Sequence, residues 1–139
     1  MRTILAKAFA LGLFFSFSLC FLMLPSQETL NYEKILGAWD IEVVAEGEYY
    51  YLSMNLEKSE QELKGTISEQ SGGFTDIPLS EIKFDGQTLS FDFTAPTPPD
   101  GLERLIKTEF KVADNRLEGT LNVVDLGVTA TAIATRKEK

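Results

Sequence analysis

The sequence predicts an all-β protein, an antiparallel up-and-down β-barrel of about eight strands with a short helical turn before the first strand. Apolar and polar residues alternate through most of the chain after Gly37, as they do in strands with one face in a core and one in water. The segments between these runs are short and rich in glycine, aspartate and asparagine, so neighbouring strands should pair antiparallel.

The first strand is expected to follow Gly37, in the stretch "KILGAWDIEV". Trp39, Ile41 and Val43 share one face of this strand, and the acidic residues between them share the other. Residues 29–36 are the only helical candidate, one or two turns long. The single tryptophan of the chain therefore enters the core at the start of the sheet.

The later runs repeat this pattern. Their inward positions are Tyr50, Leu52, Met54, Leu56, Leu63, Ile67, Leu89, Phe91, Phe93, Ile106, Thr108, Phe110, Leu117, Leu121 and Val123. The run 77–84 changes phase near Ser80 and Glu81, which predicts a bulge or bend there. The prolines of residues 95–101 predict a stiff loop rather than a central strand.

A sheet of this length without covering helices must hide its edges. Closing it into a barrel does so, whereas the alternative, a two-sheet sandwich, usually needs a longer crossing connection than this chain offers. We therefore expect the last strand to pair with the first.

The last strand, "VTATAIATR", predicts a contact at one end of the barrel if it pairs with the first strand. Ala130, Ala132, Ala134 and Arg136 share one parity, so Arg136 should come near Trp39. A guanidinium stacked on an indole is worth about 1 kcal/mol, and its donors could satisfy carbonyls of the helical turn. Trp39 and Arg136 are thus predicted to be a structural pair that closes the barrel end.

These features resemble the calycin group, which includes lipocalins, fatty-acid-binding proteins and avidins. The resemblance lies in Gly37-x-Trp39 after a short helical turn and in Arg136 late in the final strand. In that group the tryptophan and arginine pack across the closed end, which implies the same structural role here. The chain is also similar to small exported lipocalin-like domains of bacteria.

The N-terminus predicts export. Arg2 and Lys7 precede an uncharged apolar run, residues 8–24, which a proline and Ser26 follow. This order is typical of a secretory signal peptide, here residues 1–26, and implies a periplasmic or secreted protein. Two alternatives are a retained membrane anchor and lipidation at Cys20, although the residue before that cysteine is not small.

The mature domain would be residues 27–139, one domain of ordinary size. Removing the two basic residues of the leader changes the formal net charge from −8 to −10. Such an acidic surface argues against nucleic acid and anionic lipid as partners, so a membrane would be met only through an uncleaved N-terminus. Without a cysteine after the leader, the domain must be stabilised by its core.

Composition also argues against an enzyme. The chain has no histidine, which removes the commonest general base and the commonest transition-metal ligand. No Gly-x-Ser-x-Gly elbow and no phosphate-binding loop occurs, and the acidic residues alternate outward along the strands. We expect a non-catalytic protein without a cofactor or a metal site.

Binding of a small hydrophobic molecule inside the barrel is the favoured function. An eight-stranded barrel either fills itself with side chains or holds one small ligand, and three alanines leave room on one wall. Tyr50 and Thr108 would supply hydrogen bonds in an apolar lining. The candidate ligand-binding residues are Tyr50, Met54, Phe91, Phe93, Thr108 and Phe110.

The alternative is a packed barrel that acts as a protein-interaction or inhibitory module. Tyr49, Tyr51 and Ile133 are predicted on the outer face, and Phe74 lies in a loop that could present it to a partner. The proline loop 95–101 would offer a second, rigid edge.

Overall fold

The computed structural model describes residues 30–138. The predicted leader, residues 1–26, lies outside the described residues. Within residues 30–138, every helix is too short or too polar to cross a membrane.

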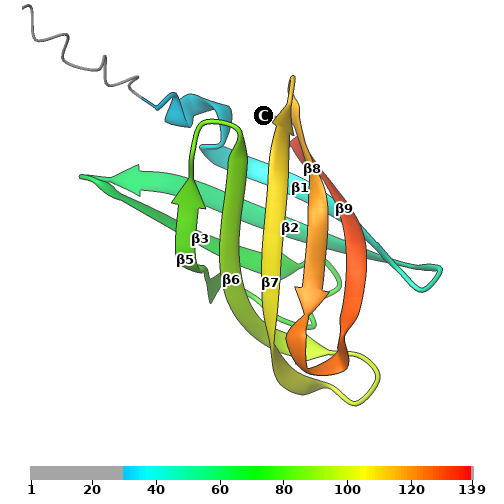
Figure 1. Ribbon diagram of the computed structural model, residues 1–139. Coiled ribbons are helices and arrows are strands. Elements are labelled where there is room, and N and C mark those ends of the chain that lie inside the picture. Colours follow the sequence, from blue (N-terminus) through cyan, green and yellow to red (C-terminus); the bar gives the residue numbers. More distant parts are fainter. Residues whose placement is uncertain (1–29, 139) are drawn as a thin grey trace, which may run out of the picture.

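Nine strands and two short 3₁₀ helices make up the described chain (Figure 1). They are η1 (Tyr32–Lys34), β1 (Gly37–Ala45), β2 (Glu48–Ser59), β3 (Glu62–Glu69), β4 (Ile77–Pro78), β5 (Ser80–Phe84), β6 (Thr88–Thr97), β7 (Leu102–Ala113), β8 (Arg116–Val123), η2 (Val124–Leu126) and β9 (Val128–Arg136).

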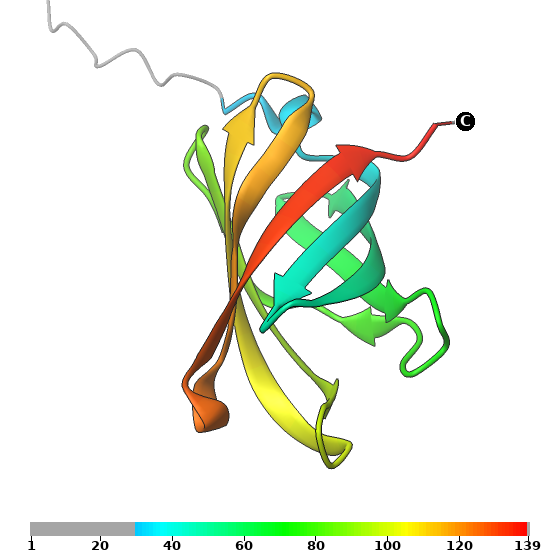
Figure 2. The ribbon, with the colours of Figure 1, turned by 90° about the vertical axis from the view of Figure 1, so that its right-hand side faces the viewer.

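All nine strands belong to one antiparallel sheet in the order β4-β3-β2-β1-β9-β8-β7-β6-β5. The first and last strands, β1 and β9, pair from Trp39 opposite Arg136 to Val44 opposite Thr131, which joins the two ends of the meander (Figure 2). The prediction of an antiparallel up-and-down barrel is confirmed, with nine strands in place of about eight.

The additional strand arises where the alternation changes phase. The run 77–84 divides at Leu79 into β4 and β5, and the pairing of β5 with β6 shifts register between Ser80 and Lys83. β4 and β5 are the two edges of the sheet, yet the Leu79 N–H donates to the Gly65 carbonyl at 2.9 Å. The barrel is thus nearly closed at the place where the sequence predicts a bulge.

The proline segment 95–101 is only partly the loop that the sequence predicts. β6 continues to Thr97, and Pro96 lies opposite Glu103 of β7. The pairing of β6 with β5 ends at Asp92, so the last residues of β6 have β7 as their only sheet neighbour. A proline without an N–H is tolerated at such a free edge.

The interior is tightly packed at one end and opens toward the other. Along β9 the exposed fraction rises from 0% at Ala134 to 3% at Ala132 and 7% at Ala130. Along β7 it rises in the same direction, from 0% at Phe110 to 6% at Ile106. The residues near Trp39 are therefore shielded most completely, and the strand ends far from Trp39 border open space.

The closed end is built around Arg136. Its guanidinium carbon lies 4.5 Å from the centroid of the Trp39 ring. Its Nη1 and Nη2 donate to the carbonyls of Leu36 and Glu33, each at 2.6 Å. The Trp39 Nε1–H donates to the Ile35 carbonyl at 2.8 Å, so both side chains hold the η1 segment over the barrel end.

This arrangement explains the glycine of Gly37-x-Trp39. Gly37 has a φ of +112°, a conformation that L side chains rarely adopt. A Cβ there would lie 3.3 Å from Nη1 of Arg136. The glycine thus lets the chain turn from η1 into β1 while the guanidinium lies against the backbone.

Candidate functional site

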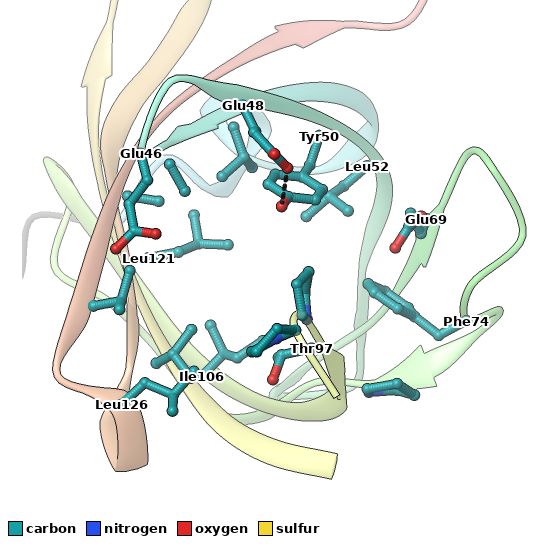
Figure 3. A pocket seen from close by; sticks show the side chains of 18 of the residues that line it. Glu46, Glu48, Tyr50, Leu52, Glu69, Phe74, Thr97, Ile106, Leu121 and Leu126 are labelled. Carbon is teal, nitrogen blue, oxygen red and sulfur yellow. Dashed lines mark hydrogen bonds between the residues drawn. The ribbon is translucent and has the colours of Figure 1, made fainter. Parts of the chain in front are cut away.

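A cavity of about 510 Å³ occupies the open end of the barrel (Figure 3). Pockets that hold small molecules typically measure roughly 300–1,000 Å³. The lining residues are Val43, Ala45, Glu46, Glu48, Tyr50, Leu52, Glu69, Phe74, Phe93, Pro96, Thr97, Pro98, Pro99, Ile106, Leu121, Val123, Leu126, Val128 and Ala130. They come from the ends of the strands and from the connections β1–β2, β3–β4, β6–β7 and η2.

Small side chains on two neighbouring strands help to leave this space. Ala45 of β1 and Ala130 of β9 line the cavity, whereas Ala132 and Ala134 lie deeper in the core. The large aromatic side chains are packed on the opposite wall, where the Phe91 ring lies 6.2 Å from the rings of both Phe93 and Phe110. The core is thus filled below the cavity.

The six side chains predicted to bind a ligand divide into two groups. Tyr50 and Phe93 line the cavity. Met54, Phe91, Thr108 and Phe110 do not line it, because they occupy inward positions nearer the closed end, where they are at most 4% exposed. Thr108 lies one inward position below Ile106, and its Oγ1 has no hydrogen-bond partner in the described structure.

Sequence reasoning missed the mouth of the cavity. Glu46, Glu48, Glu69 and Leu126 lie at strand ends or in connections, where alternation no longer says which way a side chain points. Phe74 was expected in a loop that presents it to a partner. It faces the cavity instead, and its ring lies 6.3 Å from that of Phe93. The signal in the sequence that could have predicted this inward position is that Phe74 is a lone aromatic residue in a polar loop.

The mouth is negatively charged. The Tyr50 hydroxyl donates to Oε2 of Glu48 at 3.0 Å (Figure 3). Burial raises the pKa of Tyr50, and the hydrogen bond to Glu48 and the charges of Glu48, Glu69 and Glu46 raise it further. The described residues include no group of three or more acidic or cysteine side chains that could hold a metal ion.

Pro96, Thr97, Pro98 and Pro99 form one lip of the cavity, and an ion pair outside the cavity holds this lip in place. Nη1 and Nη2 of Arg104 donate to the two carboxylate oxygens of Asp100, each at 2.7 Å. Nη1 of Arg104 also donates to Oγ1 of Thr97 at 2.8 Å, and Thr97 lines the cavity. The Arg104 guanidinium holds the pKa of Asp100 well below its usual range.

No protein-family model matches this chain, and no curated protein matches it significantly. One solved structure is similar to it in fold. It is a single-residue mutant of the fluorescent protein UnaG, with a TM-score of 0.49 and 15% sequence identity over 77% of this chain and 99% of that one.

The outer face of the barrel carries the residues that were considered for contact with a protein partner. Tyr49 and Tyr51 of β2 are 60% and 50% exposed, and Ile133 of β9 is 45% exposed. Tyr51 and Ile133 both lie opposite Glu42 of β1, on either side of it, so a carboxylate separates the two apolar side chains.

Proposed function

We propose that this protein is an exported, non-catalytic carrier that binds a small hydrophobic molecule in the cavity at the open end of the barrel. The observation that supports this proposal best is the contrast between the two ends of one interior. Side chains fill the closed end, and about 510 Å³ of apolar-walled space remains at the other.

The lining suits recognition of an apolar body. Leu52, Phe93, Ile106 and Leu121 surround the inner part of the cavity, and burying apolar ligand surface against them contributes about 25 cal/mol per Å² before the costs of association. The titratable lining groups are three carboxylates and one phenol. We assign them to recognition rather than to a reaction, because the Tyr50 hydroxyl, which donates to Glu48, has a raised pKa and so keeps its proton.

Native mass spectrometry of the protein purified gently from its own host tests the carrier function. Extra mass that is lost on denaturation would support a bound ligand and begin to identify it. A bare polypeptide that persists as a dimer, or with a captured protein, would favour contact through the outer face with Tyr49 and Tyr51. The denatured mass also tests export, because a cleaved leader removes residues 1–26.

A second test fills the cavity by mutation. Ala130→Phe fills the cavity from β9, whereas Thr131→Phe adds the same side chain to the outer face of the same strand. Binding of a neutral apolar dye such as N-phenyl-1-naphthylamine should be lost in the first variant and kept in the second. Val128→Phe, at a half-buried lining position, repeats the test should Ala130→Phe not fold.

Equal dye binding by Ala130→Phe, Val128→Phe and the unmodified protein would refute the proposed site. The circular dichroism of each variant controls for loss of the barrel.

A further inference from the structure

We propose that the cavity selects a cationic amphiphile, a molecule with an apolar body and an ammonium group, over anions of the same shape. This inference rests on the proposed function, since it names the class of ligand that the same cavity takes. It follows from where the cavity places its charges and from the absence of any opposite charge among its described lining residues.

Three glutamates stand around the mouth. Glu46 and Glu48 flank the β1–β2 turn, and Glu69 ends β3. Figure 3 shows Glu46 and Glu69 on opposite sides of the opening, with Glu48 between them along the rim. A ligand that enters the cavity must therefore leave its outer end among three carboxylates.

Among the described residues, no ion pair involves any of these three carboxylates. None of the described residues that line the cavity is lysine or arginine. Arg104, which contacts the lip residue Thr97, has both terminal nitrogens engaged by Asp100. The Tyr50 hydroxyl donates to Glu48 and carries no charge, so the negative potential of the mouth persists.

The raised pKa of Tyr50 agrees with this geometry. Burial and the Glu48 hydrogen bond contribute most, and the fields of Glu69 and Glu46 act in the same direction. The phenol therefore resists becoming an anion at the place where an anionic head group would lie. An ammonium group there would be stabilised by the same fields.

Below the mouth the wall is apolar. Tyr50 is half-buried, whereas Leu52, Ile106 and Leu121 are buried lining residues, 5–6% exposed. The order from outside to inside is thus carboxylates, a phenol and then hydrocarbon. A molecule that matches this order has a cationic end and an apolar body.

The test compares three probes that share one tail and differ in charge. The probes are dodecylammonium, dodecanol and dodecanoate, which compete with N-phenyl-1-naphthylamine bound to the mature protein. The two ionic probes are kept below their micelle-forming concentrations and dodecanol below its solubility limit. We expect dodecylammonium to displace the dye at a concentration at least about ten-fold below that of dodecanoate, with dodecanol between them. The gap should narrow in about 1 M salt, where the Debye length falls to about 3 Å.

Two triple variants separate the mouth from the general acidity of the protein. The mouth variant combines Glu46→Gln, Glu48→Gln and Glu69→Gln and so removes the three charges at the mouth of the cavity. The matched control combines Glu57→Gln, Glu60→Gln and Glu62→Gln. It removes three exposed charges outside the cavity lining, near the end of β2, in the β2–β3 turn and at the start of β3. The gap between dodecylammonium and dodecanoate should disappear in the first and remain in the second.

The outcomes are distinguishable from those of the proposed function. A dye that binds and is displaced equally by all three probes, or by dodecanoate best, would overturn the charge selection and leave the carrier function intact. A gap that the mouth variant keeps, or that the control variant loses, would also overturn it, as would a bound dye that no probe displaces. A dye that does not bind at all would refute both.

Discussion

Truncation of Arg136 tests the structural account of the closed end most directly. Arg136→Ala removes two hydrogen bonds of 2.6 Å, to the carbonyls of Leu36 and Glu33, and the stack on Trp39. Each hydrogen bond from a charged donor is worth up to about 3 kcal/mol, but Arg136 is exposed, so about 1 kcal/mol each is the appropriate value. The exposed cation–π contact adds roughly 0.5–1 kcal/mol.

We therefore expect Arg136→Ala to lower the free energy of unfolding by about 2–3 kcal/mol. For a domain of this size, that corresponds to a fall in Tm of roughly 8–12 °C. Chemical denaturation followed by the fluorescence of the single tryptophan measures both the stability and the environment of Trp39. Dye binding should change little, because the cavity lies at the other end of the barrel.

Arg116→Ala is the matched control. Arg116 is exposed on β8, and its one ion pair within residues 30–138 is with Glu118 of the same strand, at 2.6 Å. Such a surface ion pair contributes at most about 1 kcal/mol. Arg136→Lys should fall between the two, since a lysine keeps the charge but cannot reach both carbonyls with a planar fork. Equal losses of stability in Arg136→Ala and Arg116→Ala would refute the closing role of Arg136.

Three further predictions concern the sheet, the lip and the mouth. Gly119→Ala should lower the free energy of unfolding by at least about 3 kcal/mol, because the added Cβ would overlap the backbone carbonyl of Glu109 on β7. The control, Thr120→Ala, should change the free energy of unfolding little. Equal denaturation midpoints for the two variants would contradict this prediction. Asp100→Asn should lower Tm at neutral pH, because a carboxyl group whose pKa is lowered in the folded protein stabilises the fold at a pH above its unfolded pKa of about 3.9. The difference in Tm from the unmodified protein should shrink as the pH falls below that value. A difference that does not change with pH in thermal scans would argue against the ion pair. Because the pKa of Tyr50 is raised, its protonated form stabilises the fold below pH about 10, and this contribution is lost at higher pH. Tyr50→Phe should therefore lose less stability than the unmodified protein on alkaline titration. Parallel curves of stability against pH for the two proteins would contradict the raised pKa.

Much of the fold follows from the sequence because alternation is a local property. Side chains on a strand change face with every residue, so the inward set can be found wherever the pattern is regular. The phase change near Ser80 has the same origin, and it appears as the division of one run into β4 and β5. The parity of the last strand likewise places Arg136 on the inward face, opposite Trp39 once the barrel closes.

The candidate site follows from the sequence only in part. Tyr50 and Phe93 line the cavity, but Met54, Phe91, Thr108 and Phe110 share their inward faces and lie in the packed part of the core. Parity tells which face a residue occupies and says nothing of its depth along the barrel axis. That depth depends on the stagger between strands and on which ends the loops cover.

The sequence by itself thus determined an all-β meander, its inward residues and the pair that closes one end, because each follows from periodicity and from the pairing of first and last strands. Only the tertiary structure decided where space remains. It brings Glu46, Glu48 and Glu69 to one rim and turns Phe74 inward, although these residues lie in or beside connections on two different hairpins. Their meeting depends on the curvature of the closed sheet, which no local pattern in the chain records.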